Sequence, residues 1–142
     1  MSETLLRFRD DEPVEDAAVT VDVFGDQTNA SAVIIEAGDD ARELLPHLDR
    51  IRLIAVDFPV FGDGRGYSAA RILREAGYRG ELRAVGDVLV DQLAAMRRCG
   101  FDSFAPDVAL DPADADAALS RWADVYQATA DGRQPIWAKR HG

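Results

Sequence analysis

Short apolar runs alternate with amphipathic stretches along most of the chain, and this pattern predicts alternating strands and helices. The β-branched run at 31–36 and the apolar run at 51–57 are typical of buried strands. Between such runs, leucine and alanine recur at spacings that place them on one face of a helix. In chain order, we expect strands at 17–24, 31–36, 51–57, 81–85 and 103–105, with helices at 40–50, 67–76, 87–99 and 112–131.

Capping residues support several of these helix boundaries. Asp39 or Asp40 can cap the first helix and Asp87 the third, because an aspartate side chain accepts hydrogen bonds from free N–H groups of the first turn. Asp111-Pro112 is a strong helix start, since proline suits the first helical position. Pro46 falls inside the first helix, so we expect that helix to be kinked or to begin near Pro46.

The alternation of strand and helix repeats about four times and predicts an α/β fold with a mostly parallel sheet of four to five strands and helices on both faces. A closed barrel of eight β/α units takes about 200 residues or more, so 142 residues favour an open sheet. A partial β/α barrel, completed by a second chain, is the alternative. We expect a single α/β domain at 17–132, with a flexible acidic arm at 1–16 and a C-terminal tail at 133–142.

The composition is that of a soluble globular protein, with 47% hydrophobic and 30% charged residues. A net charge of −10 argues against nucleic acid as a partner, because phosphate backbones bind basic surfaces. No apolar run approaches the ~20 residues that span a membrane, and no signal-peptide pattern begins the chain, so we expect no membrane association and a cytoplasmic protein. The single cysteine, Cys99, agrees with a reducing compartment.

Ligands of open parallel sheets bind beyond the carboxyl ends of the strands, which selects the loops 36–40, 57–67 and 85–87. The middle loop combines aromatic, acidic and basic side chains with glycines that let a ligand approach the backbone. The candidate catalytic residues are Asp57, Arg65 and Asp87. The candidate ligand-binding residues are Phe61, Asp63, Gly64, Gly66, Tyr67 and Arg83.

Each of these candidates also has a purely structural explanation. Gly64, Gly66 and Ala69 match the G-x-G-x-x-A pattern of a dinucleotide-binding turn. In that turn the first glycine directly follows the strand, whereas here six residues separate the preceding strand from Gly64. In the structural explanation, the glycines only shape a turn. Asp57 would accept hydrogen bonds from loop amides. Arg83 lies inside a strand, so its charge needs a partner or a cleft; Asp57 and Asp87 are the candidates.

Several chemistries have no matching pattern. The chain has no C-x-x-C pair, so we expect neither a metal site of the usual zinc spacing nor an iron–sulfur cluster. His47 and His141 are the only histidines, and neither has a set of ligating residues nearby. No G-x-S-x-G elbow and no phosphate-binding P-loop occur.

The segment 57–104 carries the motifs D-F-P-x-F-x-D-G-R-x-Y-S-x-A-R-x-L-R, G-E-L-R-A-V-G-D-V-L-x-D-Q-L and R-C-G-F-D-x-F. On these motifs the chain resembles a bacterial family of uncharacterised function. Its members are often described as probable oxidoreductases and are commonly encoded beside assimilatory sulfite reductase and phosphoadenylylsulfate reductase. The resemblance implies a role in sulfur assimilation, and it implies no particular reaction.

Two functions remain as hypotheses. In the first, the chain is an accessory protein that binds or supports sulfite reductase through the arginine-rich segment 57–104 or through the tail at Trp137. In the second, it is a small oxidoreductase or an anion- or nucleotide-binding enzyme that uses the loop residues named above. Its electron carrier would then be a bound flavin or nicotinamide nucleotide, because one cysteine cannot supply a dithiol couple. The lack of a complete catalytic set favours the accessory role.

Overall fold

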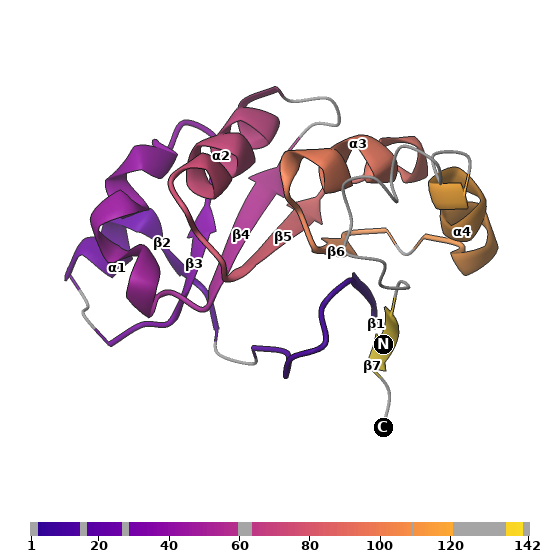
Figure 1. Cartoon of the computed structure of the whole chain (residues 1–142), viewed down its shortest axis with the longest axis horizontal. Coiled ribbons are helices and arrows are strands. Elements are labelled where there is room, and N and C mark those ends of the chain that lie inside the picture. Colours follow the sequence, from indigo (N-terminus) through magenta and orange to yellow (C-terminus); the bar gives the residue numbers. More distant parts are fainter. Residues whose placement is uncertain are drawn as a thin grey trace.

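The computed structural model describes residues 3–14, 17–26, 29–59, 64–108, 110–120 and 136–140. Its centre is a seven-stranded sheet with the strand order β2-β3-β4-β5-β6-β1-β7 (Figure 1). The strands are β1 (Glu3–Arg7), β2 (Val19–Thr20), β3 (Ala32–Ile35), β4 (Leu53–Phe58), β5 (Glu81–Gly86), β6 (Ser103–Pro106) and β7 (Ile136–Arg140). The α-helices are α1 (Val21–Asp26), α2 (Gly64–Glu75), α3 (Leu93–Cys99) and α4 (Pro112–Ser120), and the 3₁₀ helices are η1 (Ala41–Arg50) and η2 (Val90–Gln92).

The sheet is mostly parallel, which confirms the predicted α/β class. Parallel pairing joins β2, β3, β4, β5 and β6 in turn, and β1 lies antiparallel between β6 and β7. The predicted number of four to five strands is too low, since the described part of the chain contributes seven. The additional strands β1 and β7 lie in the segments assigned above to an arm and a tail, so both of these segments take part in the sheet.

The helices η1, α2, α3 and α4 form one row along one face of the sheet, which corrects the prediction of helices on both faces. From β2 to β6 the strands follow one another in the sheet as they do in the chain. Right-handed crossovers that always advance in one direction place every connecting helix on the same face. In agreement, η1 contacts α2, α2 contacts α3, and α3 contacts α4 (Figure 1). This winding is that of the alternative, a segment of a β/α barrel.

The hydrophobic core lies between the sheet and this row of helices. From the central strand β4 it takes Ile54, Val56 and Phe58, each almost fully buried. Leu73 of α2 and Met96 of α3 pack in the same core and are also fully buried. Because side chains alternate along a strand, the remaining residues of β4 face the side of the sheet without helices.

Two of the three predicted helix caps are confirmed. Asp40 before η1 and Asp111 before α4 each accept a hydrogen bond from the backbone N–H two residues on, at 3.0 and 2.8 Å. Asp87 caps no helix, because η2 begins only at Val90. The Asp87 N–H instead donates to the carbonyl of Phe58 at 2.7 Å, which continues the pairing of β5 with β4.

Two predicted elements have a different conformation. The strand expected at 17–24 is limited to Val19–Thr20, and helix α1 begins at Val21. Val21 and Phe24 are both buried, and their spacing of three residues suits a helix rather than a strand. The helix expected at 40–50 is a 3₁₀ helix with Pro46 inside it. The predicted helix 112–131 is described as far as residue 120.

The buried ring of Phe58 lies against Gly66, which leads to a test of the core. A Cβ at Gly66 would lie 2.3 Å from a ring carbon of Phe58, whereas a Cβ at Gly64 would have nothing within 4 Å. We therefore expect Gly66→Ala to lower the free energy of unfolding by about 1–3 kcal/mol, because the ring must move within a packed core. The measurement is urea denaturation.

Gly64→Ala, in the same helix, is the matched control for this variant. It should leave stability unchanged or raise it by up to about 1 kcal/mol, since alanine restricts the unfolded chain more than glycine does. Equal stabilities of the two variants would contradict the packing of Phe58 on Gly66.

Candidate functional site

Asp57 and Arg65 both line a small cavity at the carboxyl edge of the sheet. Asp57 lies near the end of β4, and Arg65 lies in the first turn of α2, the helix that follows β4. Together with residues 36–39, which follow β3, they line a cavity of about 20 Å³. A cavity of this volume holds about one water molecule. This cavity among the described residues is therefore smaller than a flavin or a nicotinamide nucleotide.

The loops that follow β4, β5 and β6 are joined at this edge by backbone hydrogen bonds. The Asp87 N–H donates to the Phe58 carbonyl at 2.7 Å, and the Asp107 N–H donates to the Gly86 carbonyl at 2.9 Å. Asp57 and Asp87 thus lie at the same edge of the sheet, although Asp87 is not part of the cavity wall. The catalytic roles assigned to this edge stay predictions.

Asp57 has surroundings that favour the protonated form of its carboxyl group. Burial raises the pKa of the Asp57 carboxyl, and the negative charge of Asp107 raises it further. A raised pKa brings a carboxyl closer to the pH at which it can both take up and release a proton. An acid–base role for Asp57 is therefore compatible with its position.

The second glycine at the start of α2 serves packing. Gly66 is buried and lies against the ring of Phe58, so its missing side chain lets the helix approach β4. Gly64 is exposed at the first position of the helix. The dinucleotide-binding pattern therefore has a structural explanation at its second glycine.

The aromatic and acidic residues predicted in the same loop are only partly described. Phe61 and Asp63 lie outside the described residues. Tyr67 is half-buried, and its ring meets the ring of Phe58 edge-on, with 5.6 Å between the centroids. Burial raises the pKa of the Tyr67 hydroxyl, with a smaller effect from Cys99, so this hydroxyl stays protonated at neutral pH.

Arg83 belongs to a different environment from the other predicted residues. It lies in the middle of β5, where it donates to Glu81 Oε2 at 2.8 Å and to Ser103 Oγ at 3.2 Å. The predicted partners, Asp57 and Asp87, are therefore wrong. Glu81 lies two residues before Arg83 and so on the same face of the strand, and Ser103 lies opposite Arg83 on β6. This is the face of the sheet without helices.

Glu81 and Arg7 form a buried ion pair on that face. Their side chains are 1% and 4% exposed, and Arg7 Nε donates to Glu81 Oε1 at 3.0 Å. Burial raises the pKa of Glu81, but hydrogen bonds from Arg7 and Ser103 and the charge of Arg83 outweigh it, so the pKa lies below its usual value. The N-terminal strand is thereby held to the centre of the sheet by charge as well as by backbone pairing.

A second buried carboxylate, Asp102, continues this network toward the helices. Its side chain accepts hydrogen bonds from Arg9, from Arg74 and from the Leu82 N–H, at 2.9, 2.9 and 2.8 Å. Burial raises the pKa of Asp102, and the charges of Arg74 and Arg9 only partly oppose it. Arg9 also binds both carboxylate oxygens of Asp11, which holds the pKa of Asp11 well below its usual range.

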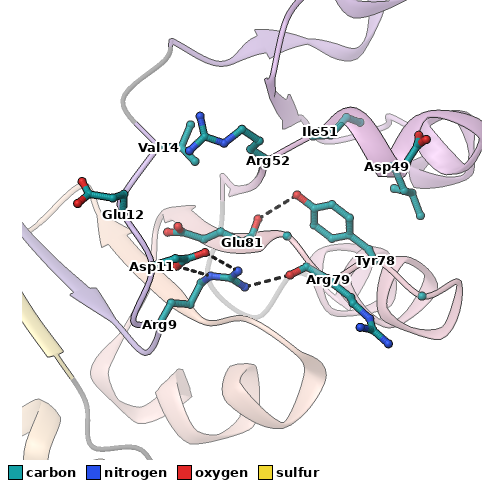
Figure 2. A pocket seen from close by; sticks show the side chains of 13 residues that line it. Arg9, Asp11, Glu12, Val14, Asp49, Ile51, Arg52, Tyr78, Arg79 and Glu81 are labelled. Atoms are coloured by element: carbon teal, nitrogen blue, oxygen red, sulfur yellow. Dashed lines mark hydrogen bonds and ion pairs between the residues drawn. The ribbon is translucent and has the colours of Figure 1, made fainter.

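A cavity larger than the one at the carboxyl edge lies above this network, at the amino edge of the sheet (Figure 2). Its volume is about 550 Å³, and we call it the amino-edge cavity. Its walls come from the chain after β1, from the end of η1 and from the turn before β5. The lining residues are Arg9, Asp11, Glu12, Val14, Leu48, Asp49, Ile51, Arg52 and residues 77–81.

Sequence reasoning missed the amino-edge cavity for an identifiable reason. The rule for open parallel sheets directs attention to the carboxyl ends of the strands, whereas this cavity depends on the segment 9–14 crossing the other edge. That segment reads as a polar arm. The apolar pattern of Leu5, Leu6 and Phe8 was the available signal, because all three are buried and hold the start of the chain in the fold.

These observations define an α/β protein whose helices cover one face of the sheet and whose other face holds a buried arginine–carboxylate network. None of the helices within the described ranges has the length and hydrophobicity of a membrane span. In the same ranges, no group of three or more histidine, cysteine, aspartate or glutamate side chains is placed to hold a metal ion.

The chain belongs to the family described as "Bacterial protein of unknown function (DUF934)", whose sequence profile matches residues 32–137. The matched range includes the motif-rich segment 57–104 and β3 to β6. Comparisons with curated proteins and with solved structures found no match.

Glu81→Gln tests the buried ion pair. It removes the carboxylate charge shared by Arg7 and Arg83, and a buried charge left without its partner costs about 3–5 kcal/mol. We expect a loss of that order in the free energy of unfolding at pH 7, measured by urea denaturation. Arg42→Ala is the control, because its pairing with Asp40 is exposed and 3.9 Å long; it should cost about 0.5 kcal/mol or less.

The wild-type protein and Glu81→Gln also give a pH test of this ion pair. Because the pKa of Glu81 is lowered in the folded state, its stabilising contribution is complete above 4.5, the usual pKa, and is lost as the pH falls through the folded-state pKa. The difference in stability between wild type and Glu81→Gln should therefore shrink in acid. A difference that stays constant down to pH 2 would contradict the ion pair.

Asp57→Asn tests whether the carboxyl edge keeps an acid at the expense of stability. The pKa of Asp57 is raised in the folded state, so its ionised form opposes folding above that pKa. Asparagine removes this opposition, and we expect the variant to unfold at a higher urea concentration than wild type at pH 7. The gain should disappear near pH 3, where the carboxyl is protonated in both states. A variant less stable than wild type at pH 7 would show that Asp57 forms stabilising bonds instead.

Proposed function

We propose that this chain is an accessory protein of assimilatory sulfite reduction, which binds or supports sulfite reductase through the carboxyl edge of its sheet. The pathway rests on the resemblance carried by the motifs of segment 57–104. The observation that supports a contact surface at this edge is a pair of exposed apolar side chains, Leu89 and Val108.

Leu89 and Val108 lie on adjoining loops, after β5 and β6. Their side chains are 40% and 78% exposed. The residues before them, Val88 and Asp107, both donate their backbone N–H to the Gly86 carbonyl, at 3.0 and 2.9 Å. The two loops therefore meet at one oxygen atom, and their exposed apolar residues share one edge of the sheet. Apolar side chains gathered on an exposed edge favour contact with another protein.

Carboxylates lie in the loops connected to this apolar pair. Asp57, Asp87 and Asp107 lie in the same set of connected loops. A partner surface that offers arginine or lysine side chains around an apolar centre would complement them, and such complementarity favours specific association. The net charge of −10 acts in the same direction over longer distances.

The arginines of segment 57–104 are less suited to this contact than their number suggests, because several bind within the protein. Arg74 donates to the Gly100 carbonyl and to Asp102. Arg97 lies over the ring of Phe8, with 4.3 Å between guanidinium carbon and ring centroid. Arg83 is held in the buried network described above. The side chain of Trp137, the other predicted contact, lies outside the described part of the structure.

Leu89→Asp tests the proposed surface. The wild-type protein should co-elute with the sulfite reductase of the same bacterium in size-exclusion chromatography at micromolar concentration. We expect Leu89→Asp to weaken this association by about tenfold or more, because a charge replaces an apolar contact at the centre of the interface. Val23→Asp is a matched control, since Val23 is 39% exposed and lies on α1 beside the outermost strand.

The control should bind as wild type does. Failure of the wild-type protein to associate at tens of micromolar would remove the accessory role. Equal binding by Leu89→Asp and Val23→Asp would remove the carboxyl edge as the contact surface.

The raised pKa of Asp57 favours a second candidate, a small enzyme that binds an anion at the same edge. Asp57 would hold or move a proton, and Arg65, which shares the small cavity, would hold the charge of the substrate. Thermal stabilisation by sulfate, a flavin or a nicotinamide nucleotide, lost in Arg65→Ala, would support this alternative. No stabilisation by any of these ligands would leave the accessory role alone.

A further inference from the structure

The amino-edge cavity has the size of a ligand-binding site, and neither the sequence motifs nor the proposed function assigns it a role. Its volume of about 550 Å³ lies within the usual range of small-molecule pockets, about 300–1,000 Å³. We propose that it binds a small organic anion, with the Arg52 guanidinium and the Tyr78 hydroxyl as its hydrogen-bond donors.

A network of paired charges lies below the cavity. The connected network below it contains four guanidinium groups and three carboxylates, joined by the hydrogen bonds and ion pairs given above. The members are Arg7, Arg9, Arg74 and Arg83 with Asp11, Glu81 and Asp102. Of these seven side chains, only Arg9, Asp11 and Glu81 line the cavity, so the network contributes one cation and two carboxylates to its wall.

Arg52 adds a second cation in the wall. Its backbone N–H donates to the Ser31 carbonyl, and its carbonyl accepts from the Glu81 N–H. Its side chain makes no hydrogen bond, ion pair or ring contact with the residues that the structure describes. In Figure 2 this side chain extends along the cavity toward the segment that carries Val14. Arg79 also lines the cavity, but Figure 2 shows its guanidinium turned away from Arg52 and Tyr78. Arg52 is thus the available guanidinium.

Tyr78 supplies a neutral donor opposite Arg52. The residue is 4% exposed, and its hydroxyl donates to the Glu81 carbonyl at 3.5 Å, the outer limit of a hydrogen bond. A closer acceptor on a ligand would take over this donor at little cost. Burial raises the pKa of the Tyr78 hydroxyl, so the group keeps its proton at neutral pH.

The remaining walls favour an organic anion over a bare inorganic one. Val14, Leu48 and Ile51 contribute apolar surface to the same cavity. The carboxylates of Glu12 and Asp49 lie at opposite ends of the view in Figure 2 and are turned outward, away from Tyr78. A ligand with an apolar or aromatic body and one carboxylate or phosphate group would match both the donors and the apolar walls.

Isothermal titration of the full chain with four probes tests this site. Phenyl phosphate and benzoate carry an aromatic body with a charge, inorganic phosphate carries only a charge, and benzyl alcohol carries only the body. We expect phenyl phosphate, benzoate or both to bind more tightly than inorganic phosphate and benzyl alcohol. The difference between the two aromatic anions identifies the preferred oxyanion.

Two variants and one control place the binding. Arg52→Ala should lower the affinity for the tighter-binding aromatic anion by about tenfold or more, because it removes a charge-assisted hydrogen bond. Tyr78→Phe keeps the buried ring but removes the hydroxyl, and it should lower the affinity for the same anion by about threefold. Arg71→Ala, an exposed arginine of α2 without a contact to the described residues, should bind as wild type does.

Three results would overturn the proposal. They are no binding of either aromatic anion at millimolar concentration, equal binding of the neutral or inorganic probe, and an Arg52→Ala variant that binds as well as Arg71→Ala. Because the exposed Arg52 side chain has no hydrogen bond, ion pair or ring contact to lose among the described residues, circular dichroism and urea denaturation of Arg52→Ala should match wild type. Weaker binding then cannot be ascribed to unfolding.

Discussion

The buried carboxylate of Glu81 is the constraint on which the arrangement of the N-terminal segment depends. A charge that is 1% exposed must be paired, because burial without a partner costs several kcal/mol. Arg83 comes from the same strand, but Arg7 must be brought from 74 residues away in the chain. That requirement holds β1 beside β6, with Arg7 opposite Ser103. The chain must then cross the sheet to reach β2 at its other side, and this crossing forms a wall of the amino-edge cavity.

The order of the strands explains why charge can gather on one face of the sheet. Since the crossovers from β2 to β6 all advance in one direction, the helices and most of the hydrophobic core lie on a single face. The opposite face is free to carry polar residues at alternate positions, and Arg7, Ser103, Arg83 and Glu81 form a row across three neighbouring strands there. The structure therefore separates an apolar layer from a charged one.

The two edges of the sheet differ in what they can bind. The carboxyl edge encloses little space among the described residues but exposes Leu89 and Val108 on loops that share a hydrogen-bond acceptor. The amino edge encloses about 550 Å³ beside the Arg52 guanidinium and the Tyr78 hydroxyl. Contact with a macromolecule suits the first edge, and enclosure of a small anion suits the second. The two edges lie at opposite ends of the same strands.

The sequence by itself determined the α/β class, the parallel strands β3 to β6 and the caps at Asp40 and Asp111, because alternation, apolar runs and capping depend on residues close together in the chain. Its motifs also indicated the family that residues 32–137 confirm. Only the tertiary structure decided that β1 enters the sheet, that Arg7 binds Glu81 and Arg83 binds Ser103, and that the amino-edge cavity forms. These features join residues far apart in the chain, and the local patterns of the sequence carry no signal for which distant segments will meet.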